Sequence, residues 1–403
     1  MKSVTKSLSC GRKLLTMIVL AGSLSAAAQD STLTRYARQN QYVLQSNGPQ
    51  FSGAGWEKLR ADMLKSQFVL VGEEHGMAQI PALTVALARE FKPALYVAEI
   101  DPYVAQTLTR LTTQPGPPTA YQQRYPEALC FYNLAEEYEL VRSLRAQQTR
   151  LVGIDQVFIT TAAPIYAQLA SLVKSPLART YFTERAATYQ RQTQAFEKRS
   201  AEEWVMLKQS QAAIDSLLAL TKSESPAARQ LAQDYAASHA IYRSGSHQAR
   251  LNLMKRNLLR ELRPGEATPR MLFKFGAYHV ARGVSPAPFG EFYDVGNLVQ
   301  NLADAQGQKS LHVLVVGKQG AEARGTNPNF SDKNIATYTA ADKPKYQSFL
   351  ALSTGPAWSV FDLRPARRAI TAGKLQVSEA LRRHILGYDY LVVIPETTAS
   401  RPM

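Results

Sequence analysis

The sequence is poor in cysteine, which limits how the fold can be stabilised. Cys10 and Cys130 are the two cysteines among the 403 residues, and Cys10 lies in an N-terminal segment that we expect to be removed. Because one cysteine would then remain, the mature chain cannot form an internal disulfide, even in an oxidising compartment. Roughly 370 residues are enough for a large hydrophobic core to supply the stability instead.

Sequence signatures of the common nucleophilic, nucleotide-dependent and zinc-dependent enzymes are also absent. The sequence contains no Gly-x-Ser-x-Gly nucleophile elbow, no glycine-rich phosphate loop and no His-Glu-x-x-His pattern. Cys130 stands among apolar and aromatic residues, which is typical of a packed thiol rather than a reactive one. These absences leave histidine and carboxylate chemistry on water as the expected type of reaction.

Binding to nucleic acid and insertion into a membrane are not expected. The formal net charge is +15, but lysine and arginine are scattered along the chain and no nucleic-acid-binding motif occurs. No segment after the N-terminus approaches the roughly 20 apolar residues that a spanning helix needs. The expected partner is therefore a small-molecule substrate, and the oligomeric state is not predicted.

The first 28 residues are interpreted as a signal peptide. Four basic side chains precede an apolar run at residues 14–22, and the small residues Ala26, Ala27 and Ala28 follow that run. Cys10 precedes the run, whereas a lipidated cysteine would have to follow it. We therefore expect cleavage after Ala28, export to the periplasm or the medium, and a single domain over residues 29–403. The alternative is an uncleaved membrane anchor, although the apolar run is well short of the about 20 residues that a spanning helix needs.

Short apolar, β-branched runs bounded by turn residues predict six strands. They lie at residues 67–71, 95–100, 150–154, 271–275, 312–316 and 388–394. A helical pattern at 77–91 connects the first two strands, which predicts an α/β fold with a mostly parallel central sheet flanked by helices. The stretch at 320–345 is expected to be an irregular loop.

A helical segment at about residues 162–262 is predicted between two of these strands. It is rich in alanine, glutamine and leucine, and we expect about four helices, broken near Pro176, near Ser200 and at residues 223–226. Such a segment could cover the site or pack against one face of the sheet, and the sequence leaves both arrangements open.

Polar side chains follow four of the predicted strands, where ligands bind in open parallel sheets. The candidate residues are Glu73, Glu74, His75, Glu99, Asp155 and His279, with Asp101 two residues after Glu99. Each also has a structural interpretation, because a carboxylate can cap a helix and a histidine can serve the core. Glu99 follows a strongly apolar run and needs a partner if it is buried. Their joint placement favours one shared site.

These elements resemble the paired Gly-x-x-His pattern of the Tiki/TraB, ChaN-like and erythromycin-esterase-like superfamily. The matching elements are Gly72-Glu73-Glu74-His75, Glu99, Gly153-Ile154-Asp155 and Gly276-Ala277-Tyr278-His279. Arg250, Met254 and Asn257 match the Arg-x-x-x-Met-x-x-Asn helix of the esterase-like branch. The C-terminal Gly387-Tyr388-Asp389-Tyr390 and Glu396-Thr397-Thr398 resemble its last strand. The resemblance covers roughly residues 55–400.

The chain also departs from the erythromycin esterase pattern at two positions. Erythromycin esterases have Gly-Glu-x-x-His-Gly, whereas only Glu74 separates Glu73 from His75 here, as in the ChaN-like form. Leu251 replaces the aspartate that often follows the helix arginine. The roles of Glu73 and Glu74 and the identity of the substrate are therefore not carried over.

The leading hypothesis is hydrolysis of an ester or a lactone without a required cofactor. His75 would act as general base on water, oriented by Glu73 or Glu74. His279 would polarise the carbonyl or protonate the leaving alkoxide, and Arg250 would steady the developing negative charge.

Two alternatives follow from the same resemblance. Tiki-like relatives resemble metal-dependent peptidases, which implies a divalent metal held by His75, His279 and Glu99. ChaN-like relatives resemble haem-binding proteins, which implies ligand capture without catalysis.

Overall fold

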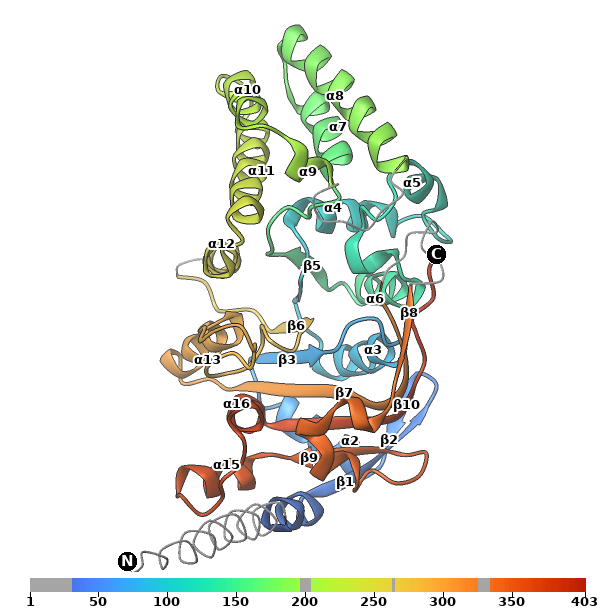
Figure 1. Cartoon of the computed structure of the whole chain (residues 1–403), viewed down its shortest axis with the longest axis vertical. Helices are drawn as coiled ribbons and strands as arrows, with labels where there is room; N and C mark the ends of the chain where they lie inside the picture. Colours follow the sequence, from blue (N-terminus) through green and yellow to red (C-terminus); the bar gives the residue numbers. More distant parts are fainter. Residues whose placement is uncertain (1–30, 196–203, 263–264, 325–333) are drawn as a thin grey trace, which may run out of the picture.

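The computed structural model describes residues 31–195, 204–262, 265–324 and 334–403, so the expected signal peptide lies outside the described residues. A ten-stranded sheet forms the centre of the molecule (Figure 1). The strands are β1 Gln41–Asn47, β2 Gln50–Ser52, β3 Phe68–Glu73, β4 Leu95–Ala98, β5 Arg150–Gly153, β6 Met271–Gly276, β7 Ser310–Ala323, β8 Ile335–Tyr338, β9 Trp358–Asp362 and β10 Tyr390–Thr397.

The strand order is β2-β1-β9-β10-β7-β3-β6-β4-β5, with β8 paired to β7. The six strands from β10 to β5 run parallel, and β1, β2, β8 and β9 add antiparallel pairs. The predicted α/β class with a mostly parallel sheet is confirmed. The apolar runs form the parallel strands because such strands are buried on both faces.

Two layers of helices cover the sheet. One core cluster is formed with α2 Ala54–Met63, α3 Gln79–Phe91, α4 Pro102–Leu111 and α6 Ala135–Ala146. The other is formed with α12 His247–Arg260, α13 Val295–Ala305, α14 Gln347–Leu350, α15 Arg364–Thr371 and α16 Glu379–Gly387. The described residues also contain the short elements α5 Thr119–Arg124, η1 Cys130–Asn133, η4 Ala340–Asp342 and η5 Pro344–Tyr346. No helix among the described residues is long and apolar enough to cross a membrane.

The helical segment is inserted between β5 and β6. Its helices are α7 Ala162–Leu172, α8 Pro176–Gln194, α9 Val205–Lys208, α10 Gln211–Thr221, α11 Pro226–Ser244 and α12. The first five share a core cluster that also contains Tyr103 of α4, and they project away from the sheet, whereas α12 packs on the sheet (Figure 1). The segment therefore has more helices than the four predicted. One extra break occurs at Gly245, whose left-handed φ of 63° ends α11 before Ser246 caps α12.

The prediction of an irregular loop over residues 320–345 is wrong at both of its ends. Strand β7 continues to Ala323, and β8 pairs with it antiparallel, with Gly320 opposite Tyr338. The two short helices η4 and η5 follow. Local sequence did not reveal this ribbon because the end of β7 contains glycine and charged residues and β8 is only four residues long, so their pairing rather than an apolar run holds them together.

Candidate active site

The carboxyl ends of β3, β4, β5 and β6 bring the predicted polar residues together. Glu73 ends β3, Glu99 follows β4, Asp155 follows β5, and His279 lies three residues after β6. Arg250 reaches them from α12. Of the seven candidate residues, six form one connected network of hydrogen bonds and ion pairs, and Glu74 lies outside it.

His75 is the histidine of this network that faces open space. Its Nδ1 lies 2.9 Å from Oε1 of Glu73, its Nε2 lies 3.6 Å from Oε2 of Glu99, and its side chain is 33% exposed. The ring stacks on Phe131 with centroids 4.2 Å apart. Burial lowers the pKa of His75, but the hydrogen bond and charge of Glu73 and the charge of Glu99 outweigh it and raise the pKa above its usual value.

Glu99 is the centre of the network. Its Oε1 accepts from Nη2 of Arg250 at 2.9 Å and lies 3.3 Å from Nε2 of His279. Its Oε2 accepts from the backbone N–H of Gly276 at 2.7 Å. Burial raises the pKa of Glu99, but the charges of His279, His75 and Arg250 dominate and hold that pKa well below its usual value. Glu99 is therefore ionised at neutral pH.

His279 lies between Glu99 and a residue that the sequence did not single out, Asp294. Nδ1 of His279 lies 2.8 Å from Oδ2 of Asp294, whose Oδ1 accepts from the N–H of Val295 at the start of α13. Burial opposes protonation, yet Glu99 and Asp294 raise the pKa of His279 to about 10. Both ring nitrogens thus carry protons at neutral pH, and each points to a carboxylate.

Arg250 connects the helical segment to the strand ends. Its Nε donates to Oδ1 of Asp155 at 2.9 Å and its Nη2 to Oδ2 at 2.5 Å, while Nη2 also reaches Glu99. Two turns later, Nδ2 of Asn257 donates to the carbonyl of Ile154 at 2.9 Å. The Arg-x-x-x-Met-x-x-Asn spacing therefore places both polar side chains on the face of α12 that packs on the sheet.

The glycines of the two Gly-x-x-His elements leave room for neighbouring side chains. A Cβ on Gly276 would lie 2.8 Å from Nε2 of His75 and 3.3 Å from Oε2 of Glu99. A Cβ on Gly72 would lie 2.7 Å from the hydroxyl of Tyr388. Any larger residue at Gly276 would push the side chains of His75 and Glu99 out of place.

Glu74 points away from the histidines. It forms an ion pair with Lys343, whose Nζ also lies 3.8 Å from the centre of the Tyr338 ring. Glu73, by contrast, contacts His75 directly. The two adjacent glutamates thus face different partners because successive residues at a strand end point to opposite sides.

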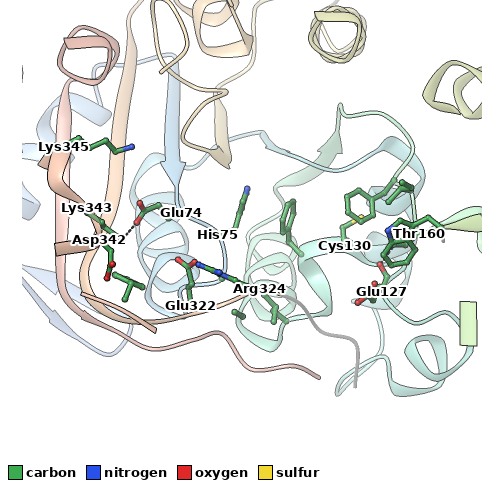
Figure 2. Close-up of a pocket in the computed structure, with 18 of the residues that line it drawn as sticks. Glu74, His75, Glu127, Cys130, Thr160, Glu322, Arg324, Asp342, Lys343 and Lys345 are labelled. Atoms are coloured by element: carbon green, nitrogen blue, oxygen red, sulfur yellow. Dashed lines mark hydrogen bonds and ion pairs between the residues drawn. The ribbon is translucent and has the colours of Figure 1, made fainter. Parts of the chain in front are cut away.

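A cavity of about 1090 Å³ opens beside His75. In Figure 2, His75 stands between one wall that carries Glu74, Lys343 and Lys345 and another that carries Cys130 and Thr160. Phe131, Phe158, Ile159 and Trp204 add apolar surface. Burial raises the pKa of the Cys130 thiol well above its usual value, so this wall residue is not poised as a nucleophile.

Three functional candidates escaped the sequence analysis: Asp294, Lys274 and Glu137. Lys274 lies in the apolar strand β6, and its Nζ donates to Oε1 of Glu73 at 2.5 Å and to Oε1 of Glu137 at 2.7 Å. A lysine inside the run Met271-Leu272-Phe273-Lys274-Phe275 is a signal that could have been used, because a buried ammonium needs partners. Asp294 and Glu137 carry no comparable local signal.

The residues expected to hold a metal do not fit that role in this arrangement. The carboxylate of Glu99 is already surrounded by Arg250, His279 and the N–H of Gly276, and the guanidinium would repel a divalent cation.

A different group offers three ligand atoms within 4.8 Å of one another. Among the described residues this group is His247, His279 and Asp294. Two of its members, His279 and Asp294, are joined by a hydrogen bond that a metal would have to replace. The positions of these three side chains are therefore explained equally well without a metal, by a protonated His279 that donates to Asp294.

Comparison with known proteins finds likeness in structure alone. No family model and no curated protein matches the chain. A protein from Bacillus cereus matches with a TM-score of 0.57 and 15% identity, over 93% of this chain and 99% of its own. A succinoglycan biosynthesis protein matches with a TM-score of 0.57 and 12% identity, over 93% and 99%.

A variant of the erythromycin esterase EreC in its open conformation is also similar. Its TM-score is 0.56 at 14% identity, over 89% of this chain and 98% of its own. The resemblance that the motifs indicated is thus confirmed at the level of the fold: this chain has the fold of an erythromycin esterase.

Proposed function

We propose that this chain is a hydrolase in which His75 activates water to attack an ester or a lactone. The observation that carries the proposal is the pairing of His75 with Glu73 at the edge of the cavity. Nδ1 of His75 is held by a buried carboxylate, while the side chain is one-third exposed. This arrangement fixes Nδ1 as the protonated nitrogen and leaves the lone pair of Nε2 for water.

The reaction balances with His75 as the carrier of one proton. Nε2 takes a proton from water as the oxygen attacks the carbonyl carbon, and Glu73 stabilises the imidazolium that forms. When the tetrahedral intermediate collapses, the C–O bond breaks and His75 returns the proton to the leaving alkoxide. The products are a carboxylic acid and an alcohol, or one hydroxy acid from a lactone.

We propose that His279 and Arg250 act on Glu99 rather than directly on the substrate. His279 is buried and Arg250 is half-buried, both lie against Glu99, and their charges keep that carboxylate ionised. We propose that they hold Glu99 near Nε2 of His75, where its negative charge favours the imidazolium in the transition state. Asp155 and Asp294 would orient these two cations from the other side.

The cavity and the fold support a small-molecule substrate. A volume of about 1090 Å³ with apolar and charged walls is large enough for a ligand well beyond the size of a simple ester. The erythromycin esterase EreC has the same fold, and its name describes hydrolysis of an ester in a small molecule. Export of the mature chain belongs to the same proposal, because residues 29–403 follow the expected signal peptide.

The test is turnover of a panel of esters and lactones by the chain without residues 1–28. We expect His75→Asn to lower kcat by at least about 100-fold, because general base catalysis contributes on that order. His384→Asn is the matched control, since His384 lies buried on α16 outside the network. Full turnover by folded His75→Asn protein would refute the proposal.

A further inference from the structure

A buried row of three charged side chains lies behind His75. Lys274 donates to Glu73 on one side and to Glu137 of α6 on the other, at 2.5 and 2.7 Å. The three side chains are between 2% and 4% exposed. Removing an ionised group from water costs several kcal/mol unless neighbouring charges neutralise it. Three such groups side by side are therefore expected to have a role beyond stability.

The charges of the row are not balanced within it. Burial favours the neutral form of Lys274, but Glu137 and Glu73 outweigh it, so its pKa is raised and it is a cation. Burial raises the pKa of Glu73, but Lys274 and His75 outweigh this effect and lower it, so Glu73 is an anion. An ionised Glu137 would therefore leave the row with one negative charge in excess.

Two carboxylate oxygens of the row are buried without a hydrogen-bond partner among the described residues. They are Oε2 of Glu73 and Oε2 of Glu137. The other ionisable groups that face the row are His75, Tyr96 and Tyr132, and the two phenols lie 3.1 Å apart. Burial raises the pKa of each phenol, so neither supplies charge at neutral pH. The remaining group that can balance the excess charge is His75.

We propose that Lys274 and Glu137 are positioning residues of the His75 site: Lys274 holds Glu73 against Nδ1 of His75, and Glu137 supplies the charge that favours the His75 imidazolium. The catalytic part of this inference rests on the proposed function. The electrostatic coupling between Glu137 and His75 rests on the geometry alone. Neither residue touches the cavity beside His75. Both act through Glu73.

The physical basis is that one proton is shared by two sites. Burial and the charge of Glu73 raise the pKa of Glu137 to about 7, against the attraction of Lys274. When Glu137 is neutral, the Glu73–Lys274 pair is neutral and a neutral His75 is favoured. When Glu137 loses its proton, the added negative charge strengthens His75 as a base. The two groups must then titrate as a coupled pair.

The experiment follows the titration of His75 by NMR in the chain without residues 1–28. The signal is assigned with His75→Asn among the six histidines. In the wild-type protein we expect two steps. In Glu137→Gln, which keeps an acceptor for Lys274, we expect one step, with the upper pKa lowered by on the order of 0.5 to 1 unit. The acidic limb of the pH–rate profile should move by the same amount.

Glu139→Gln is the matched control, because Glu139 lies two residues away on α6, is exposed and pairs with Arg142. An unchanged His75 titration in folded Glu137→Gln protein, or an equal shift in Glu139→Gln, would overturn the proposal. Should Glu137→Gln fail to fold, a single-step titration of wild-type His75 would overturn it as well. If His75 and Glu137 titrate as a coupled pair but no ester is turned over, the coupling is supported and the proposed function is refuted.

Discussion

His279 lies between two buried carboxylates, and this position determines its charge. The sequence predicted that His279 polarises the carbonyl or protonates the leaving alkoxide, and the structure raises the pKa of His279 to about 10. Burial alone would have lowered that pKa. The charge of Glu99 and the hydrogen bond to Asp294 reverse the direction because both carboxylates are themselves held by N–H donors. The same residue type thus has different surroundings at positions 75 and 279.

The charge of His279 predicts a pH-dependent contribution to stability. Its pKa is raised on folding, so its stabilising contribution is complete below about pH 6.5 and is lost as the pH rises toward 10. The free-energy difference between the wild type and His279→Gln should therefore shrink across this window, by at most about 1.4 kcal/mol per pH unit. Urea unfolding at pH 6 to 9.5 measures it, and parallel stability curves would contradict the charge assignment.

A substitution at Gly276 tests how closely the side chains of His75 and Glu99 are packed. In Gly276→Ala the new Cβ would meet Nε2 of His75 and Oε2 of Glu99, which must move aside. We expect turnover to fall by about 10- to 100-fold, because small displacements of reacting groups cost that much. Stability should change little, since both contacts are ends of side chains. Gly283→Ala is the control, because its Cβ would meet nothing within 4 Å. Equal activity of the two variants would refute the interpretation.

Among the elements, α12 shows most clearly how a sequence pattern determines which side chains face the sheet. It is the helix of the inserted segment that packs on the sheet, with Leu251, Met254 and Leu258 in the core of that face. The same face presents Arg250 to Asp155 and Glu99. The sequence left open whether the segment covers the site or packs on the sheet. In the structure α12 packs on the sheet, whereas α7 to α11 pack in a separate core cluster that also contains Tyr103 of α4.

Arg250→Lys should weaken this connection although it keeps the charge. A lysine cannot reproduce the paired bonds of the guanidinium to Asp155 while it also reaches Glu99. We expect a stability loss of about 1–3 kcal/mol and a clear drop in kcat/KM. Arg256→Lys on the exposed face of α12 is the control. Thermal unfolding and kinetics measure both effects. Wild-type stability and activity of Arg250→Lys would show that the paired guanidinium bonds to Asp155 are dispensable.

For the molecule as a whole, the central prediction concerns metal dependence. Turnover should be unchanged after chelation and dialysis, because in the proposed reaction the Glu73–His75 pair would supply the base, and the donors around Glu99 disfavour a cation. Elemental analysis of the purified chain, with activity measured before and after chelator, tests this. Loss of activity that Zn²⁺ restores would favour the metal-dependent alternative and would direct attention to His247, His279 and Asp294. The haem-binding alternative stays a prediction that a haem titration checks.

Much of the central sheet could be predicted because its parallel strands are buried on both faces. All six predicted runs correspond to strands, and the polar residues that follow four of them meet at one edge. Strands β1, β2, β8 and β9 were missed. They pair antiparallel, and β1, β2 and β8 alternate buried or half-buried residues with exposed ones, so their apolar signal is weaker.

The sequence by itself determined the α/β class, the two Gly-x-x-His elements and most members of the site, because strand ends and their polar residues are local features. Tertiary structure alone decided that Glu73 rather than Glu74 pairs with His75, that His279 is protonated, and that Lys274 and Glu137 stand behind the site. The reason is physical: a charge in a buried site is set by partners that lie up to about two hundred residues away in the chain, as Lys274 does from Glu73.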